Sequence, residues 1–117
     1  MNITVPERNA ITVISVDGEL NAMTAQDLAE QLARSVRRCK NLVVELTRVR
    51  YISSAGIHVL YAALKACRQR SGDLRLVGLQ KNVQAVLTTS GFLGSTQAFR
   101  DTDSAIASFS SARVGSS

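Results

Sequence analysis

The chain has 117 residues, a formal net charge of +5 and 45% hydrophobic residues, which fits a single globular domain with its own core. Its 2 cysteines and 1 histidine cannot supply four zinc ligands without carboxylates, so we expect no metal site. No run approaches the ~18 apolar residues of a membrane span, and no signal peptide opens the chain. We therefore expect a cytoplasmic protein with reduced thiols.

The basic residues cluster at the ends of two predicted helices. Cations in the last turn of a helix interact favourably with its dipole, and no aromatic residues alternate with them to stack on bases. We therefore expect no direct binding of nucleic acid. The clustered residues are Arg34, Arg37, Arg38 and Lys40 in the first helix, and Lys65, Arg68 and Arg70 in the second.

The N-terminal segment predicts two strands. Residues 2–5 alternate between polar and apolar, and residues 6–9, with Pro6 and three polar residues, indicate a turn. Residues 10–16 are typical of a strand that can pair with the first as a hairpin. The dipeptide at 17–18 is Asp-Gly, a turn signal.

A helix and a buried strand follow. Residues 24–27 resemble a capping box, in which Thr24 would be the N-cap. Apolar residues then recur at four-residue spacing and predict an amphipathic helix to about Cys39, with Asn41 as its stop. The short run 42–46, apolar apart from Glu45, is typical of a central strand covered on both faces.

The second half repeats this alternation of helix and strand. A helix is expected to begin after Ser53 or Ser54 and to end near Arg70, because apolar residues share one face at helical spacing. Residues 74–79 then predict a strand. The apolar face consists of Ile57, Leu60, Tyr61 and Leu64.

The C-terminal third predicts two more helices and a short strand. Asn82 is expected to cap a helix that holds Val83, Val86 and Leu87, and Gly91 to close it. Residues 97–99 indicate a short edge strand. Asp101 or Asp103 is expected to start a last helix with Ile106 and Phe109 on one face.

Helix-linked strands imply parallel pairing, and the opening hairpin adds an antiparallel element. The predicted fold class is therefore α/β, with a small mixed sheet of four to five strands packed against about four helices. We expect one domain over residues 1–110 and a flexible Ser/Gly-rich tail over residues 111–117.

Two adjacent hydroxyls, Ser53 and Ser54, lie where the strand-and-loop pattern gives way to a helical one. A helix N-terminus has unpaired N–H groups and a partial positive charge. It therefore stabilises a capping hydroxyl, and it also accommodates a phosphate attached to that hydroxyl. From the residues alone, this pair is either a helix cap or a phosphorylation site that makes the domain a switch.

An enzyme is the remaining possibility, because His58 lies close enough in sequence for a serine–histidine pair. Nucleophilic catalysis would need that histidine within hydrogen-bond reach of Ser54. No G-x-S-x-G elbow, Gly-rich oxyanion loop or nucleotide-binding motif accompanies the pair. We therefore expect no catalytic residues, no cofactor and no enzymatic activity.

Three segments together resemble the STAS domain family, which includes bacterial anti-sigma factor antagonists and domains attached to sulfate transporters. The resemblance spans about residues 3–110. Residues 17–21 with Thr24 resemble the family's G-E-L-D, residues 42–46 leading into 51–57 resemble its strand before D-S-[ST]-G-L, and residues 74–79, 83–87 and 90–92 resemble its segment ending in S-G-L or S-G-F.

The resemblance implies that the chain binds an anti-sigma factor that is itself a serine kinase, so that the sigma factor is released. The kinase then phosphorylates the first serine of the motif, and a PP2C-type phosphatase resets it. That serine matches Ser54, with Ser53 as an alternative acceptor. The implied partner-binding residues are Glu19, Asn21, Thr24, Ser53, Ser54, Ala55, Gly56 and Ile57.

The chain departs from the family pattern at three positions. Ser53 stands where the motif has aspartate, Ala55 where it has a second hydroxyl, and Asn21 where aspartate is frequent. The expected docking face therefore has two fewer negative charges. The missing motif aspartate favours an alternative, a STAS subunit that is not phosphorylated and serves in a stressosome-like assembly or a lipid-transport ATPase complex. The chain is expected to be a monomer or a weak dimer.

Overall fold

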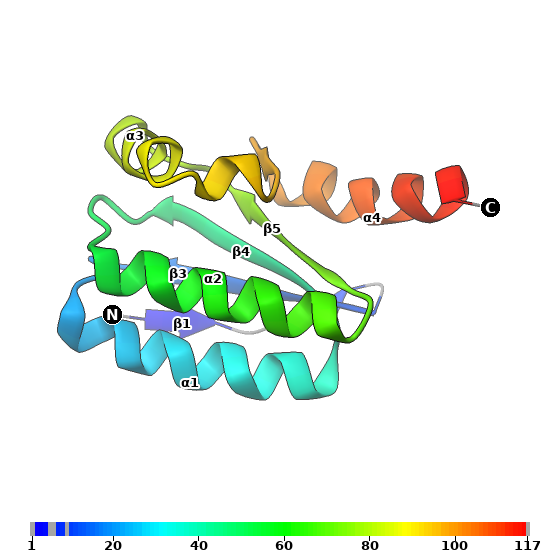
Figure 1. Cartoon of the computed structure of the whole chain (residues 1–117), viewed down its shortest axis with the longest axis horizontal. Coiled ribbons are helices and arrows are strands. Elements are labelled where there is room, and N and C mark those ends of the chain that lie inside the picture. Colours follow the sequence, from blue (N-terminus) through cyan, green and yellow to red (C-terminus); the bar gives the residue numbers. More distant parts are fainter. Residues whose placement is uncertain (1, 5–6, 9, 117) are drawn as a thin grey trace.

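The computed structural model describes residues 2–4, 7–8 and 10–116, and its centre is one six-stranded sheet (Figure 1). Four parallel strands, in the order β3-β4-β5-β6, form most of the sheet. β1 and β2 both pair antiparallel with β3. The strands are β1 (Asn2–Thr4), β2 (Glu7–Arg8), β3 (Ile11–Asp17), β4 (Asn41–Arg48), β5 (Asp73–Val77) and β6 (Ala98–Phe99).

The helices cover the two faces of the sheet unequally. α1 (Ala22–Arg38) and α2 (Ser54–Gln69) lie side by side on one face, as Figure 1 shows. α3 (Lys81–Thr89) and the short 3-10 helix η1 (Phe92–Gly94) follow β5. α4 (Thr102–Ser116) packs against β4, β5 and β6 from the opposite face. The predicted α/β class is confirmed.

Strand β4 is covered on both of its faces. Leu42, Val44 and Leu46 point into the main core beneath α1 and α2. Val43 alternates with them and enters the second cluster, which contains Ala105 and Ile106 of α4. The run is apolar because each face of this central strand meets a packed layer.

The N-terminal turn expected at residues 6–9 is wrong in one part. Glu7 and Arg8 form β2 and pair with Thr12 and Ile11, which is why the sheet has six strands and not the four to five expected. Pro6 and Asn9 lie outside the described residues, as does Val5 of the predicted first strand. The partners Thr12 and Ile11 are close in sequence, but the polar composition of this segment favours a turn over a strand.

The boundaries of the C-terminal helices and of the edge strand confirm three predictions and correct one. Gly91 follows α3 with φ +85°, a left-handed conformation that glycine adopts at low cost. Asp101 accepts a hydrogen bond from the Ser104 N–H at 2.7 Å and so starts α4. The edge strand expected at residues 97–99 is β6. Asn82 is not the cap of α3, because Gln80 occupies the N-cap position and Asn82 is already helical.

The bounds of the domain, 1–110, and the flexible tail, 111–117, stay predictions. The structure describes α4 as helical through Ser116.

Candidate functional site

Two loops meet at the carboxyl ends of β3 and β4 and place the starts of α1 and α2 next to each other. The Leu20 N–H donates to the Tyr51 carbonyl oxygen at 2.9 Å, and the Ser53 N–H donates to the Leu20 carbonyl oxygen at 2.7 Å. Leu20 and Ile52 also form an isolated parallel bridge. The sheet register therefore continues past both strands and fixes the two helix starts relative to each other.

α1 begins with a capping box, but not the predicted one. Asn21 is the N-cap, and its side-chain oxygen accepts from the N–H groups of Met23 and Thr24 at 2.9 and 3.0 Å. Thr24 is the third helical residue, and its hydroxyl accepts from the Asn21 N–H at 3.0 Å and donates to the Glu19 carbonyl oxygen at 2.6 Å. The expectation that Thr24 is the N-cap is wrong, because asparagine is an equally good cap and leaves the threonine as the reciprocal partner.

α2 begins after Ser53, so the two serines have different structural roles. Ser53 is the half-buried N-cap, and its hydroxyl oxygen accepts from the Gly56 N–H at 3.4 Å. Ser54 is the first helical residue and is exposed. Ala55 and Ile57 are half-buried beside it. The hydroxyl presented to solvent at this helix start is that of Ser54.

Gly56 is buried because the helix start lies directly against the two loops. A Cβ atom at this position would lie 2.9 Å from Cγ1 of Ile52 and 3.1 Å from Cβ of Leu20. Both neighbours belong to the main core. The glycine therefore permits the close approach that joins α2 to the loop before α1.

The electrostatics of this end favour an anion. Neither α1 nor α2 has an acidic residue in its first turn, so the positive ends of two neighbouring helix dipoles meet with no carboxylate there to offset them. Arg48 ends β4 and Arg50 follows it; both are exposed, and Arg48 pairs with Asp17 at 3.8 Å. A phosphate on Ser54 would lie at the end of the molecule where backbone and side chains supply positive charge.

α3 reaches the same end of the sheet. The Asn82 side chain donates a hydrogen bond to the Arg50 carbonyl oxygen, and the Gln80 side chain donates to the Thr47 carbonyl oxygen at 2.9 Å. A polar hollow of about 460 Å³ lies between these segments. Its lining residues are Asp17, Gly18, Glu19, Thr47, Arg48, Arg50 and Gln80.

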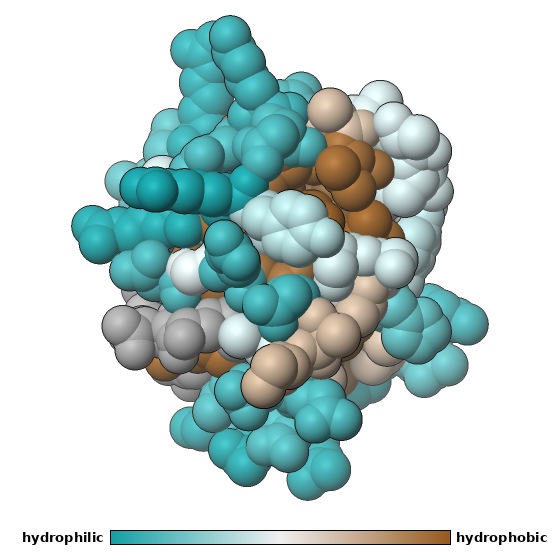
Figure 2. All heavy atoms as spheres, turned by 90° about the vertical axis from the view of Figure 1, so that its left-hand side faces the viewer, coloured by the Kyte–Doolittle hydropathy of each residue, from teal (hydrophilic) through white to brown (hydrophobic). Residues whose placement is uncertain are grey.

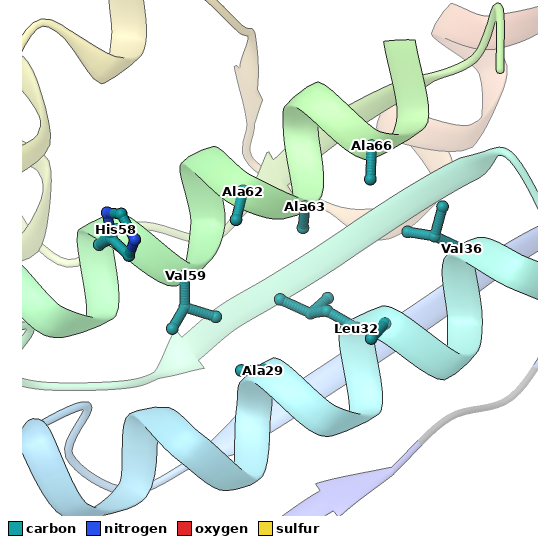
Figure 3. A pocket seen from close by; sticks show the side chains of 9 residues that line it. Ala29, Leu32, Val36, His58, Val59, Ala62, Ala63 and Ala66 are labelled. Carbon is teal, nitrogen blue, oxygen red and sulfur yellow. The ribbon is translucent and has the colours of Figure 1, made fainter. Parts of the chain in front are cut away.

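A second hollow runs between α1 and α2 and is almost entirely apolar, with a volume of about 220 Å³ (Figure 3). His58 is exposed and lies at one end of it. Among the described side chains, no hydrogen bond joins His58 to Ser53 or Ser54. The lining residues are Ala29, Leu32, Ala33, Val36, His58, Val59, Ala62, Ala63 and Ala66.

The titratable groups give no sign of a metal centre. Within residues 2–4, 7–8 and 10–116, no three His, Cys, Asp or Glu side chains are grouped closely enough to hold a metal ion. The two cysteines are free. Burial raises the pKa of the Cys67 thiol to about 12, and the Asp73 carboxylate adds to that shift.

In the same described part of the chain, no helix has the length and apolar character needed to cross a bilayer.

The structure brings the predicted site residues together at one end of the molecule. Tyr51, Asn82 and Val86 also lie there, and the sequence analysis did not assign them to the site. The one signal in the sequence was that Tyr51 lies two residues before Ser53. The residues expected at the site and found in these two helix starts and their loops are Glu19, Asn21, Thr24, Ser53, Ser54, Ala55, Gly56 and Ile57.

Fold and site together define a small α/β domain that presents an exposed hydroxyl at a helix N-terminus. The STAS domain family profile matches residues 2–105. BtrV of Bordetella bronchiseptica, named as a candidate anti-sigma factor antagonist, is 32% identical over 113 residues, which cover 96% of this chain and 97% of BtrV. The anti-sigma-B factor antagonist of Listeria monocytogenes is 33% identical over 93 residues, 78% of this chain and 82% of that protein. The chain belongs to the STAS domain family.

Solved structures share the fold. An anti-sigma factor antagonist from Mycobacterium paratuberculosis superposes with a TM-score of 0.84 at 21% identity, covering 92% of each chain. The anti-sigma factor antagonist SpoIIAA matches in its unphosphorylated form with a TM-score of 0.79 at 17% identity, covering 90% of this chain and 93% of that one. Its phosphorylated form matches with a TM-score of 0.75 at 15% identity, covering 92% and 99%.

Proposed function

We propose that this chain is an anti-sigma factor antagonist controlled by phosphorylation of Ser54. In its unphosphorylated form it binds an anti-sigma factor that is a serine kinase, and the sigma factor is released. The observation that carries this proposal is the exposed Ser54 hydroxyl at the start of α2, in a chain that resembles named antagonists over most of its length. The partner contacts the two helix starts and the loop that contains Glu19.

Ser54 is the better acceptor of the two serines. The Ser53 hydroxyl already accepts the Gly56 N–H and is half-buried, so its modification would disturb the helix cap. Ser54 is exposed and begins the helix without serving as its cap. A kinase can therefore reach the Ser54 oxygen without opening the fold, even though Ser53 replaces the aspartate of the family motif.

Phosphorylation would act on binding and not on the fold. A phosphate adds roughly 1.5–2 negative charges, which the helix start tolerates in the free domain. In a packed interface the same group must lose water and face the partner's charges, and a loss of about 4 kcal/mol would weaken binding about a thousandfold. That the related SpoIIAA fold matches in both its unphosphorylated and phosphorylated forms supports a switch without refolding.

The cycle needs a phosphatase, for which a PP2C-type enzyme is the candidate that the family resemblance implies. In this scheme the chain supplies a surface and an acceptor oxygen, acts in the cytoplasm as a monomer or weak dimer, and needs no cofactor or catalytic residue of its own.

A second candidate function follows from Ser53 and Ala55, which replace the motif's aspartate and second hydroxyl. In that case the domain is an unphosphorylated structural subunit of a stressosome-like or lipid-transport ATPase complex. Copurification with such a complex, and no phosphoserine in protein isolated from its own cells, would favour this candidate.

The test is phosphorylation by extracts of the native cells. Tagged wild-type protein is incubated with extract and ATP, and the modified residue is mapped by mass spectrometry. We expect a single phosphate on Ser54 that is lost in Ser54→Ala and kept in Ser53→Ala, which is the matched control. The kinase is then purified by following this activity, and Ser54→Asp is expected to weaken its binding. Equal binding of the wild type and of Ser54→Asp would contradict the switch.

A further inference from the structure

Three large hydrophobic side chains are exposed in the part of the chain that the structure describes, and all three belong to segments around the candidate site. Met23 in the first turn of α1 is 84% exposed, Tyr51 in the loop before α2 is 49% exposed, and Val86 in α3 is 39% exposed. Single exposed hydrophobic residues are ordinary on protein surfaces. A group of them around one site instead marks an interaction surface.

Hydrogen bonds link the segments that carry these three side chains. The Asn82 side chain donates to the carbonyl oxygen of Arg50, the residue before Tyr51. Val86 follows Asn82 by one helical turn, so both occupy the same side of α3. Tyr51 in turn is bonded to Leu20 at 2.9 Å, next to the capped start of α1 that holds Met23.

The Arg50–Asn82 hydrogen bond therefore joins the loop that holds Tyr51 to the helix that holds Val86, and Met23 follows in the first turn of α1. Figure 2, which looks onto this end of the molecule, shows hydrophobic atoms exposed among strongly hydrophilic ones. Tyrosine and methionine are among the residues enriched in the cores of protein interfaces. We call Tyr51 and Val86 the apolar patch.

The charged residues next to the apolar patch in sequence are positive, and Asp17 and Glu19 lie across the polar hollow that Arg50 also lines. Arg50, whose carbonyl oxygen accepts the hydrogen bond from Asn82, is exposed, and so is Lys81, which precedes Asn82. The chain as a whole has a net charge of +5. The family's two aspartates at this end are replaced by Asn21 and Ser53. A complementary partner surface is therefore apolar at its centre and acidic at its border.

We propose that the anti-sigma factor kinase docks on the apolar patch through an apolar depression bordered by carboxylates that face Arg50 and Lys81. This inference rests on the proposed function and adds the chemistry of the partner's surface. It also explains release, because a phosphate on Ser54 would bring negative charge up to those same carboxylates.

The test uses the kinase purified through its activity on Ser54, with dissociation constants measured by calorimetry. Tyr51→Ser is expected to weaken binding by about tenfold or more, as truncated interface anchors do. Val86→Thr is also expected to weaken binding, because it places a hydroxyl in the apolar contact without changing the size of the side chain. Val59→Thr is the matched control, because Val59 lies in the groove between α1 and α2 (Figure 3). A thermal melt of each variant checks that the fold is kept.

A separate experiment tests the role of Arg50 and Lys81 in binding the acidic border of the partner. The double variant Arg50→Gln/Lys81→Gln is expected to weaken binding at low salt and to reduce the salt dependence of the dissociation constant. The control is Arg37→Gln/Lys65→Gln, which removes two exposed cations from the outer faces of α1 and α2.

The outcomes separate this inference from the proposed function. If Ser54→Asp weakens binding while the two apolar variants bind like wild type, the docking surface is wrong and the switch stands. If the apolar variants weaken binding and Ser54→Asp does not, the docking surface stands and the switch is wrong. Binding that strengthens with added salt would overturn the acidic border.

Discussion

The backbone N–H of Ser53 donates to the carbonyl oxygen of Leu20 at 2.7 Å, so the cap of α2 is bonded directly to the residue before the cap of α1. Leu20 is fully buried and Ser53 reaches the surface. A buried anchor therefore determines the position of the exposed Ser54. The orientation of the candidate site relative to the sheet follows from this one bond and the neighbouring Leu20–Tyr51 bond.

Gly56→Ala is expected to destabilise the protein despite the higher helix propensity of alanine. The new Cβ would lie 2.9 Å from Ile52 Cγ1 and 3.1 Å from Leu20 Cβ, in a region that is already packed. Overpacking costs about 1–3 kcal/mol, against a gain of up to about 1 kcal/mol from propensity. Urea unfolding gives the difference. Gly94→Ala is the control, because nothing lies within 4 Å of a Cβ there.

The two serines are expected to differ in stability as well as in modification. Ser53→Ala removes the oxygen that accepts the Gly56 N–H and should lower the free energy of unfolding by about 0.5–2 kcal/mol. Ser54→Ala removes an exposed hydroxyl and should change it by less than about 0.5 kcal/mol. Chemical denaturation of both variants tests this. The reverse order would mean that Ser54 is the structural cap.

Asn21 offers a graded test of the α1 start. Asn21→Ala should cost about 0.5–2 kcal/mol, because the N–H groups of Met23 and Thr24 lose their acceptor. Asn21→Asp keeps the acceptor and adds a negative charge at a first turn without acidic residues, so it should gain about 0.3–1 kcal/mol at neutral pH. Thermal melts at low and high salt should show that salt reduces the gain in Asn21→Asp, which is electrostatic, and leaves the loss in Asn21→Ala unchanged.

The Cys67 thiol should be unreactive in the folded protein. It is fully buried, and burial raises its pKa to about 12, so almost no thiolate is present at pH 8. Cys39 is partly exposed. With a disulfide reagent such as DTNB we expect one fast thiol in native protein and two in denaturant. Two fast thiols in native protein would show that the end of α2 opens readily.

Arg75 is a buried cation that the fold does not fully satisfy. Its Nη2 lies 3.5 Å from Oδ2 of Asp73, and its guanidinium lies 3.9 Å from the centre of the Phe109 ring. Nε and Nη1 have no hydrogen-bond partner among the described residues. Burial lowers the pKa of this guanidinium, and Asp73 opposes that shift.

Replacing this cation by an apolar side chain of similar length is therefore expected to be harmless. Arg75→Met should be neutral or should stabilise the protein by about 1–4 kcal/mol. Asp73→Asn should destabilise it by about 1–3 kcal/mol, because it removes the carboxylate that pairs with Arg75 and also with Arg68. Urea unfolding of the two variants decides between them. A loss of stability in Arg75→Met larger than that in Asp73→Asn would show that the stacking on Phe109 dominates.

Much of the fold could be predicted because the faces of its helices and strands that are buried consist of apolar residues. The run from Leu42 to Leu46 is apolar apart from Glu45 because α1 and α2 cover one face of β4 and α4 the other. Leu60 and Leu64 recur at helical spacing because α2 packs against the sheet, and both are buried. Local patterns such as these are visible in sequence because they repeat at the period of the element.

What the sequence did not reveal depends on contacts that the local pattern of residues does not show. Glu7 and Arg8 are polar and pair only because β3 offers an edge. Asn82 was expected to cap α3, but its side chain bonds to the backbone of Arg50, 32 residues away. Val86 shares the helical pattern of Val83 and Leu87, which are buried, and yet is exposed. Nothing in the local spacing distinguishes it from its neighbours.

The position of α4 after all the strands it covers has a consequence for the nascent chain. Ile106 and Phe109 belong to the cluster that shields Val43, Val77 and Ile11 on the rear of the sheet. While the ribosome is still translating residues before 102, those three side chains lack their cover. Exposed apolar strands of this kind are prone to aggregate during synthesis. A truncation that ends before α4 should therefore yield inclusion bodies even though the helix starts that carry Ser53 and Ser54 are intact.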